Sequence, residues 1–174
     1  MDVIVGIDPG LSGSICLMPL GGKTLEPGSI VFQPFPSIAG QIDFQGLRQI
    51  FTHIKNAKVF IEKVGAMPGQ GVCSMFTFGK VTGATLAMIN AFALPYEEIT
   101  PQAWQKEMLM GIPLIEKANG KKDTKAMAAL VAQRLFPEIH LKKSEKGHVD
   151  ALLIAEYGRR KIINGLTQNV VSIK

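Results

Sequence analysis

Cysteine is scarce in this sequence. The 174 residues include two cysteines, Cys16 and Cys73, which are too far apart to form a Cys-x-x-Cys motif. Their spacing excludes a redox pair of that kind. Because the sequence opens on a short strand-like run rather than a signal peptide, we expect two reduced thiols in an intracellular, cytoplasmic protein. We therefore expect a core that is stable without a disulfide.

Long hydrophobic runs are also missing. The longest apolar stretch extends from about Ala84 to Pro95, is interrupted by Asn90 and is too short to span a bilayer. The sequence has no internal repeat, low-complexity tract or domain linker. A chain of this length buries roughly 70% of the surface that its unfolded form exposes. We predict one compact domain, with a core over about residues 3–163 and a C-terminal tail over about 165–174.

Positive charge is distributed unevenly. The formal net charge is +5, from 19 basic and 14 acidic residues. Residues 1–100 carry 6 basic and 7 acidic residues, a net of −1, so residues 101–174 carry 13 and 7, a net of +6. A basic half on a folded domain often faces a polyanion such as nucleic acid, although a solvated lysine-rich surface has the same composition.

Hydrophobic periodicity predicts strands and helices that follow one another along the chain. Residues 3–7 form a continuous apolar run, typical of a strand buried on both faces, and turn residues separate it from a second strand near 15–18. The other predicted elements are strands near 29–32, 59–61 and 95–99, and helices over about 43–54, 73–93, from 101, 124–136 and 148–163. Strands that enter and leave helices predict an α/β fold with a mixed sheet covered by helices.

Three carboxylates occupy distinctive positions in this arrangement. Asp8 ends the first buried strand, Glu62 ends the strand at 59–61, and Asp150 lies in the first turn of the last predicted helix. If the two strands are neighbours, Asp8 and Glu62 lie at the same edge of the sheet, and a helix start can bring Asp150 to them. An acidic residue at a strand end can also be an ordinary turn residue.

Such a cluster would suit a divalent cation. Like charges resist ionising together, and a bound cation removes that cost. Ligands that are all oxygen favour Mg²⁺, for which Mn²⁺ can substitute. Two such ions about 4 Å apart promote phosphodiester hydrolysis by stabilising the attacking and leaving oxygens.

Segments in the same order along the chain resemble the RuvC family of Holliday junction resolvases. Residues 6–14 (GIDPGLSGS) resemble the opening motif of the family, residues 59–63 its second acidic strand, and residues 147–155 its C-terminal acidic helix. Residues 67–71 with residues 74–80 resemble the phage-encoded branch, lactococcal phages included, more than the cellular branch. The resemblance covers about residues 3–163.

The resemblance implies a ribonuclease H-like fold, with a mixed five-stranded sheet flanked by helices. It implies a homodimer that binds one four-way DNA junction and makes two symmetric nicks, with 5′-phosphate and 3′-hydroxyl ends that a ligase can seal. Asp8, Glu62 and Asp150 match three of the metal-binding acids of the family. The sequence does not indicate whether a branch-migration motor is a partner.

The fourth metal ligand of the family has no counterpart. The family usually has an Asp or His three residues before the last Asp, and this position is Gly147 here. His148 is the nearest alternative ligand, and Glu145 is a more remote one.

The aromatic residue that stacks on a junction base in cellular members is also missing, because its position is Gly65. Phe76 and Phe78 are alternatives for stacking, although core packing suits both. Trp104, the lone tryptophan, follows a predicted helix cap and is assigned to packing rather than to base stacking.

Basic residues provide candidate contacts to DNA. Lys106 and Lys125 align with family lysines that approach the scissile phosphate, where a lysine can neutralise developing negative charge. A solvated helix surface is the alternative for each. The following residues are predicted to track DNA phosphates in a sequence-independent, salt-sensitive manner: Lys80, Lys117, Lys121, Lys122, Lys142, Lys143, Lys146, Arg159 and Arg160.

Small residues four apart, Gly79, Gly83 and Ala87, lie within the predicted helix at 73–93. They allow another backbone to approach closely, usually within the same molecule. The family resemblance makes this helix a candidate dimer interface, whose two-fold symmetry would set two active sites against one junction.

Other functions share parts of this sequence pattern. Asp8-Pro9-Gly10 also resembles the phosphate loop of sugar kinases and actin-like ATPases, but the second glycine-rich motif of those longer, two-domain proteins is missing. A ribonuclease H-like RNA-processing nuclease, a broader branched-DNA nuclease and a non-catalytic junction-binding protein are further alternatives. The main prediction is a Mg²⁺-dependent endonuclease that resolves four-way junctions.

Overall fold

A computed structural model describes residues 2–21, 28–63, 65, 69, 71–142 and 145–171. Its centre is a five-stranded sheet in the order β3-β2-β1-β6-β7. The strands are β1 (Val3–Asp8), β2 (Ser14–Pro19), β3 (Val31–Pro34), β6 (Ala57–Glu62) and β7 (Tyr96–Ile99). The β1–β2 and β2–β3 pairs are antiparallel, whereas the β1–β6 and β6–β7 pairs are parallel. The mixed five-stranded sheet expected from the sequence is confirmed.

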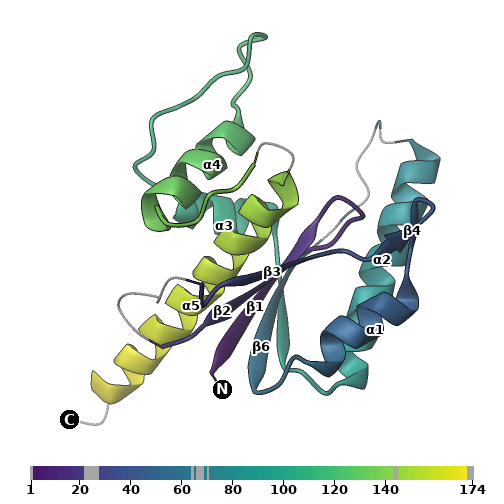
Figure 1. Cartoon of the computed structure of the whole chain (residues 1–174). Coiled ribbons are helices and arrows are strands. Elements are labelled where there is room, and N and C mark those ends of the chain that lie inside the picture. Colours follow the sequence, from purple (N-terminus) through teal and green to yellow (C-terminus); the bar gives the residue numbers. More distant parts are fainter. Residues whose placement is uncertain are drawn as a thin grey trace.

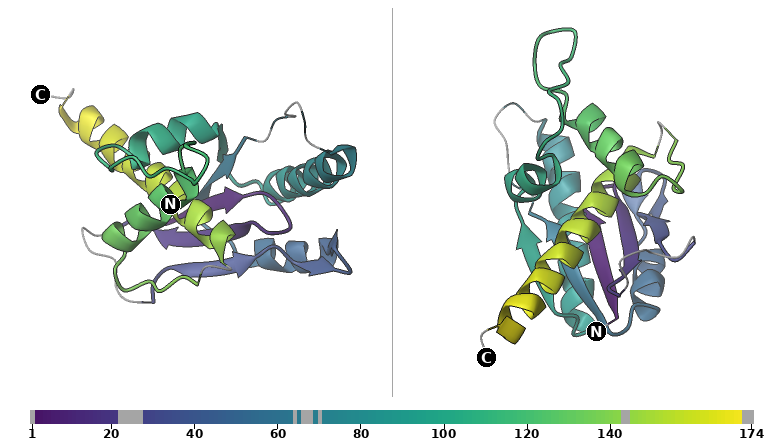
Figure 2. Two further views of the ribbon diagram at one scale, coloured as in Figure 1. Left: turned by 90° about the horizontal axis from the view of Figure 1, so that it is seen from above. Right: turned by 90° about the vertical axis from the view of Figure 1, so that its left-hand side faces the viewer.

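Helices cover both faces of the sheet (Figures 1 and 2). One face is covered by α1 (Phe44–Thr52) and α2 (Val72–Ala91). The other is covered by α3 (Pro101–Met108), α4 (Thr124–Leu135) and α5 (Lys146–Val171). A two-stranded ribbon of β4 (Ser37–Ile38) and β5 (Gln41–Ile42) precedes α1.

The sheet divides the apolar core into two layers. Successive side chains of a strand point to opposite faces, so Ile4 packs with the α3–α5 layer while Val5 and Ile7 pack with the α1–α2 layer. All three side chains are fully buried. The prediction that the first strand is buried on both faces is therefore confirmed.

Helix α5 lies in direct contact with the middle of the sheet. A Cβ atom on Gly6 would lie 2.3 Å from the carbonyl oxygen of Ala151 and 2.4 Å from the nitrogen of Ala155. Further along the helix, a Cβ on Gly158 would lie 2.3 Å from the ring of Phe60. Glycine at these crossings lets helix and sheet approach closely, which brings the start of α5 to the end of β1.

Several predicted boundaries differ from the structure. Helix α5 begins at Lys146, so Asp150 lies in its second turn, and the helix continues past the predicted end to Val171. The β4–β5 ribbon was not predicted, because its two-residue strands are too short to show periodicity.

The buried face of α4 also differs from the apolar stripe that the sequence periodicity predicts, Met127, Leu130, Val131 and Leu135. It consists of Met127, Ala128, Val131 and Ala132, whereas Leu135 is 38% exposed. The two small alanines pack against the core, and the larger leucine lies outside it. The predicted stripe was wrong because it favoured large apolar side chains over the two alanines.

Candidate active site

Asp8 and Glu62 end neighbouring parallel strands. In the register of β1 and β6, Ile7 pairs with Ile61, so the next residues, Asp8 and Glu62, project at the same edge of the sheet. The two strands are neighbours, which is the condition under which the sequence placed both acids at one edge.

The turn that follows Asp8 is tight. The nitrogen of Gly13 donates a hydrogen bond to the carbonyl oxygen of Gly10 at 2.9 Å. A Cβ on Gly13 would lie 2.0 Å from the carbonyl oxygen of Asp8, so only glycine fits at this position. The turn therefore returns the chain into β2 directly beside the carboxylate-bearing strand end.

Helix α5 brings Asp150 to the same edge. Ala151, the next residue, contacts β1 at Gly6, two residues before Asp8. The side chains of Asp8, Glu62 and Asp150 are all half-buried. The structure thus assembles the three predicted acids from β1, β6 and α5.

The three carboxylates interact electrostatically. Burial, then the charges of Asp150 and Glu62, raise the pKa of Asp8 to about 7, partly opposed by Lys125. Burial also raises the pKa of Glu62, where a hydrogen bond from Trp104 opposes the shift and the charge of Asp150 adds to it. Burial raises the pKa of Asp150, which Lys125 counteracts. Ionising all three together is therefore unfavourable without a compensating cation.

The donor chemistry of this cluster fits a hard divalent cation. Among the described residues, no three His, Cys, Asp or Glu side chains meet around one point where they could hold a metal ion together. Mg²⁺ does not require such a cage, because it usually binds one or two carboxylates and completes its shell with water and substrate phosphate. Asp8 interacts electrostatically with both other acids.

Trp104 is a site residue that sequence reasoning assigned only to packing. Its side chain is 1% exposed, and its Nε1 donates a hydrogen bond to Oε1 of Glu62 at 2.8 Å. Helix α3 follows β7, and the register pairs Ile99 of β7 with Glu62. The parallel β6–β7 pairing therefore places the start of α3 beside Glu62, a relationship that depends on the strand order.

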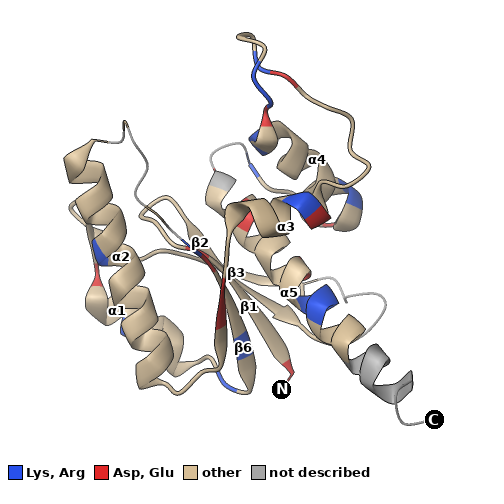
Figure 3. Ribbon diagram, turned by 180° about the vertical axis from the view of Figure 1, so that it is seen from behind, with Lys and Arg blue, Asp and Glu red and all other residues tan. Residues whose placement is uncertain are grey.

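A lysine-lined cavity adjoins the carboxylates. It has a volume of about 620 Å³, and Asp150 and Lys125 both line it. The other lining residues are Lys117, Asp123, Ala126, Ala129, Leu141, Lys142 and Val149. Figure 3 shows basic residues on the loop that leads into α4 and at the start of α4. Positive charge thus lies directly beside the acidic cluster.

Lys106 is the other lysine that the sequence predicts at the site, and the structure places it at the surface. Lys106 is exposed in the last turn of α3. The charges that shift the pKa values of the three acids include Lys125 but not Lys106. The structure therefore brings Lys125 to the carboxylates and leaves Lys106 at the surface of α3.

The remaining predicted DNA contacts are spread over the molecule. Lys121 and Lys122 are exposed on the loop before α4, and the Nζ of Lys80 hydrogen-bonds to Gln41. Lys146 is the first residue of α5, and Lys143 lies outside the described residues.

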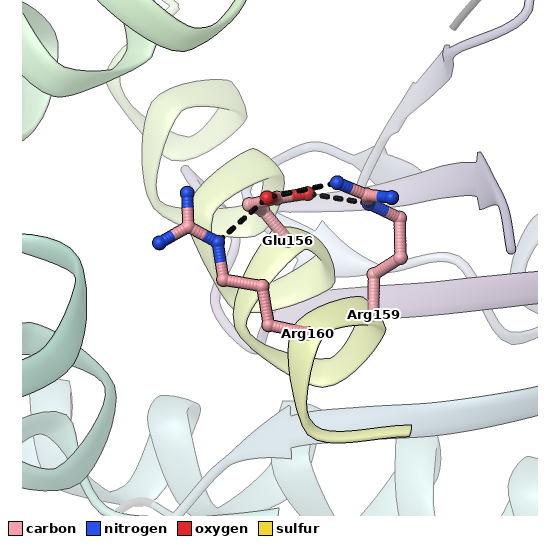
Figure 4. A network of polar contacts seen from close by, with 3 residues as sticks. All are labelled: Glu156, Arg159 and Arg160. Carbon is pink, nitrogen blue, oxygen red and sulfur yellow. Dashed lines mark hydrogen bonds and ion pairs between the residues drawn. The ribbon is translucent and has the colours of Figure 1, made fainter. Parts of the chain in front are cut away.

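Arg159 and Arg160 both bind Glu156, a carboxylate that is 3% exposed (Figure 4). The nearest donor–acceptor distances are 2.7 Å from Arg159 and 2.8 Å from Arg160. A buried carboxylate needs such partners. Both arginines therefore have a structural partner on their own helix.

Backbone fills the place where a side chain at position 147 would lie. A Cβ on Gly147 would lie 2.3 Å from the carbonyl oxygen of Ser12 and 2.7 Å from the Cα of Gly13. The β1–β2 turn thus packs directly on the start of α5.

The two alternative fourth ligands have other contacts. The ring of His148 lies 5.0 Å from that of Phe32, and both line a cavity of about 520 Å³ beside β3. Glu145 accepts a hydrogen bond from the backbone nitrogen of Lys142 at 2.8 Å and lines the same cavity. No contact that the structure shows joins either residue to the three acids.

The two candidate stacking residues lie on α2. Phe76 is 71% exposed, with the Nζ of Lys80 5.7 Å from its ring centre. Phe78 is 37% exposed, and its ring lies 3.2 Å from where a Cβ of Gly10 would be, on the turn after Asp8. Gly65 is exposed.

Helix α2 exposes the predicted stripe of small residues. Gly79, Gly83 and Ala87 are all exposed, and a Cβ on either glycine would meet nothing within 4 Å. By length and composition alone α2 is also apolar enough to cross a membrane, although one such helix is weak evidence for a membrane span. Only 17% of its most apolar 18-residue stretch is buried. Much of the apolar surface of α2 is therefore not covered by the rest of the described chain.

Comparison with solved structures identifies the fold. The chain superposes on Thermus thermophilus RuvC in complex with a Holliday junction substrate with a TM-score of 0.59 and 15% identity, covering 94% of this chain and 96% of that one. It superposes on another T. thermophilus RuvC structure with a TM-score of 0.55 and 16% identity, covering 93% and 96%. The chain has the ribonuclease H-like fold of RuvC. No protein-family model and no curated protein matches the sequence significantly.

Proposed function

We propose that this protein is a metal-dependent endonuclease that resolves four-way DNA junctions. The observation that carries the proposal is the assembly of Asp8, Glu62 and Asp150 at one edge of a RuvC-like sheet, beside a lysine-lined cavity. One RuvC structure that shares the fold was solved with a Holliday junction substrate. The similarity of two segments to phage-encoded members supports a phage-type enzyme.

The carboxylates would hold Mg²⁺, for which Mn²⁺ would substitute. We assign Asp8 and Glu62 to one ion, and Asp8 and Asp150 to a second. When bound, the ions would supply Lewis-acid stabilisation of the attacking and leaving oxygens at the phosphate.

The protein's own residues would position and neutralise the substrate. Lys125, whose charge acts on Asp8, would offset negative charge that develops on the phosphate. Lys117 and Lys142, in the same cavity, would hold the adjoining DNA backbone. Hydrolysis forms a bond from the water oxygen to phosphorus and breaks the bond to the 3′ oxygen, which takes up a proton. The products are a 5′-phosphate and a 3′-hydroxyl.

We also propose a homodimer formed through α2. The exposed glycine–alanine stripe and the neighbouring apolar side chains offer a surface for close helix packing, with Val72 83% and Phe76 71% exposed. A two-fold interface would use the same surface on both subunits. Two active sites facing one junction would account for paired, symmetric nicks.

Charge-removing variants at the acids test the proposed activity. Asp8→Asn and Glu62→Gln should each lower Mg²⁺-dependent nicking of a four-way junction by about 100-fold or more, since each removes a ligand of the ions. Both variants should still bind the junction, because the lysines are intact. Full nicking by both variants with unchanged binding would refute the assignment.

A further inference from the structure

The contact between Trp104 and Glu62 joins the buried core to the acidic cluster. The indole ring belongs to the core layer formed by α3, α4 and α5, where it packs with Met108 and Met127. Only its Nε1 edge reaches the carboxylate, at 2.8 Å. Trp104 is fixed by packing on one side and touches the site on the other.

The direction of this hydrogen bond determines what it can do. An indole nitrogen is only a donor, so it can satisfy a carboxylate oxygen but can never compete for a cation. It engages Oε1 of Glu62 and leaves Oε2 without this restraint. A partner that fixes one ligand oxygen limits the rotation of the whole carboxylate.

Backbone contacts join the strand that bears Glu62 to the helix that bears Trp104. The nitrogen of Lys63 donates to the carbonyl oxygen of Ile99 at 2.7 Å, which joins the ends of β6 and β7. The hydroxyl of Thr100, the next residue, caps α3 by accepting from the nitrogen of Ala103 at 3.3 Å. Strand end, helix cap and indole therefore form one continuous support behind Glu62.

We propose that Trp104 is a positioning residue that orients Glu62 for binding of the divalent cation. This inference rests on the proposed metal-dependent function, and it assigns Trp104 a role beyond packing. Because Trp104 is the only tryptophan of the chain, its fluorescence should also report on the occupancy of the site.

The direct test measures binding of Mn²⁺ alone, by the loss of the free-ion electron paramagnetic resonance signal. Trp104→Phe keeps an aromatic ring in the core but removes the donor, and it should weaken Mn²⁺ binding about 10-fold, as expected when a partner of a metal ligand is lost. Phe51→Leu, a fully buried site in the core layer on the opposite face of the sheet, serves as the matched control for core loosening.

The metal dependence of nicking gives a second readout. Trp104→Phe should require a higher Mg²⁺ concentration for half-maximal nicking, while the rate at saturating Mg²⁺ recovers most of the wild-type value. A merely structural role would reduce the rate at all Mg²⁺ concentrations, in parallel with stability. Wild-type Mn²⁺ affinity in Trp104→Phe, or an equal loss in Phe51→Leu, would overturn the inference.

Fluorescence separates this inference from the proposed activity. Adding Mg²⁺ to the wild type should change tryptophan emission, and Glu62→Gln should abolish that change. If the wild type binds Mn²⁺ but cuts no junction, the proposed activity fails, while weaker binding by Trp104→Phe would still support positioning. If the wild type cuts junctions but its emission does not respond to the cation, the positioning role fails alone.

Discussion

Ionisation of Asp8 is opposed by burial and by the charges of both other acids. The Asp8 side chain is half-buried, interacts with both other acids and has only the partial compensation of Lys125. Its pKa of about 7, against an ordinary value of 3.8, means that the folded protein binds a proton there more tightly than the unfolded chain does. Stability should therefore fall as the pH rises from about 4 to about 7.

Replacing this charge should stabilise the metal-free protein. Asp8→Asn should raise the free energy of unfolding at about pH 8 by on the order of 1–3 kcal/mol, with a much smaller gain at about pH 4, where the native side chain is already protonated. Urea unfolding at the two pH values without Mg²⁺ measures this difference. An equal effect at both pH values would contradict the electrostatic explanation.

The surroundings of Gly147 show why a fourth carboxylate cannot simply be added at this position. A side chain there would collide with the backbone at Ser12 and Gly13. Gly147→Asp should therefore lower both stability and Mn²⁺ affinity rather than strengthen metal binding. The opposite result, tighter binding in a stable variant, would show that the turn can move aside for a fourth carboxylate.

The alanine variants isolate the steric part of this effect. Gly147→Ala should cost about 1–3 kcal/mol, as overpacking does. Gly165 lies on the same helix, and a Cβ there would meet nothing within 4 Å. Gly165→Ala should therefore leave the free energy of unfolding unchanged or raise it by up to about 1 kcal/mol. Thermal unfolding compares the two directly.

At the scale of elements, α2 carries the exposed surface that the proposed dimer would use. Gly83→Glu places a charge where the single chain has open space, so the subunit should fold normally while the proposed dimer dissociates. Light scattering after size-exclusion chromatography measures the mass, and Gln49→Glu on α1 adds the same charge elsewhere. A dimer that persists in Gly83→Glu would place the interface on another surface.

The sequence predicted the elements that bear the acids because their signals are local. The apolar runs before Asp8 and Glu62 indicate buried strands without any knowledge of the fold. The hydrogen bond of Trp104 could not be predicted in the same way, because it depends on β6 and β7 being parallel neighbours. The contact of Gly147 with the β1–β2 turn likewise depends on how α5 crosses the sheet. Relationships between distant segments require the topology.

At the scale of the whole molecule, positive charge gathers beside the acidic edge. Lys117 and Lys142 line the cavity next to Asp150. Lys55 lies before β6 and thus at the opposite end of that strand from Glu62. The difference provides a comparison between lysines near the site and a lysine far from it.

Salt dependence of junction binding tests this charge distribution. Lys117→Gln and Lys142→Gln should each weaken binding and reduce the slope of log affinity against log salt by about 1, since each removes one phosphate contact. Lys55→Gln should leave the slope unchanged. Equal effects of all three variants would indicate that the charge acts diffusely rather than through the cavity.

The most direct test of the central claim is cleavage of a labelled synthetic four-way junction with Mg²⁺, beside duplex, Y-shaped and RNA/DNA hybrid controls. We predict paired symmetric nicks in the junction that a ligase can seal, and little cutting of the controls. Cutting of every branched substrate would indicate a broader debranching nuclease, and preferential cutting of the hybrid an RNA-processing enzyme. Binding of the junction without any cutting would contradict the account and indicate a junction-binding protein.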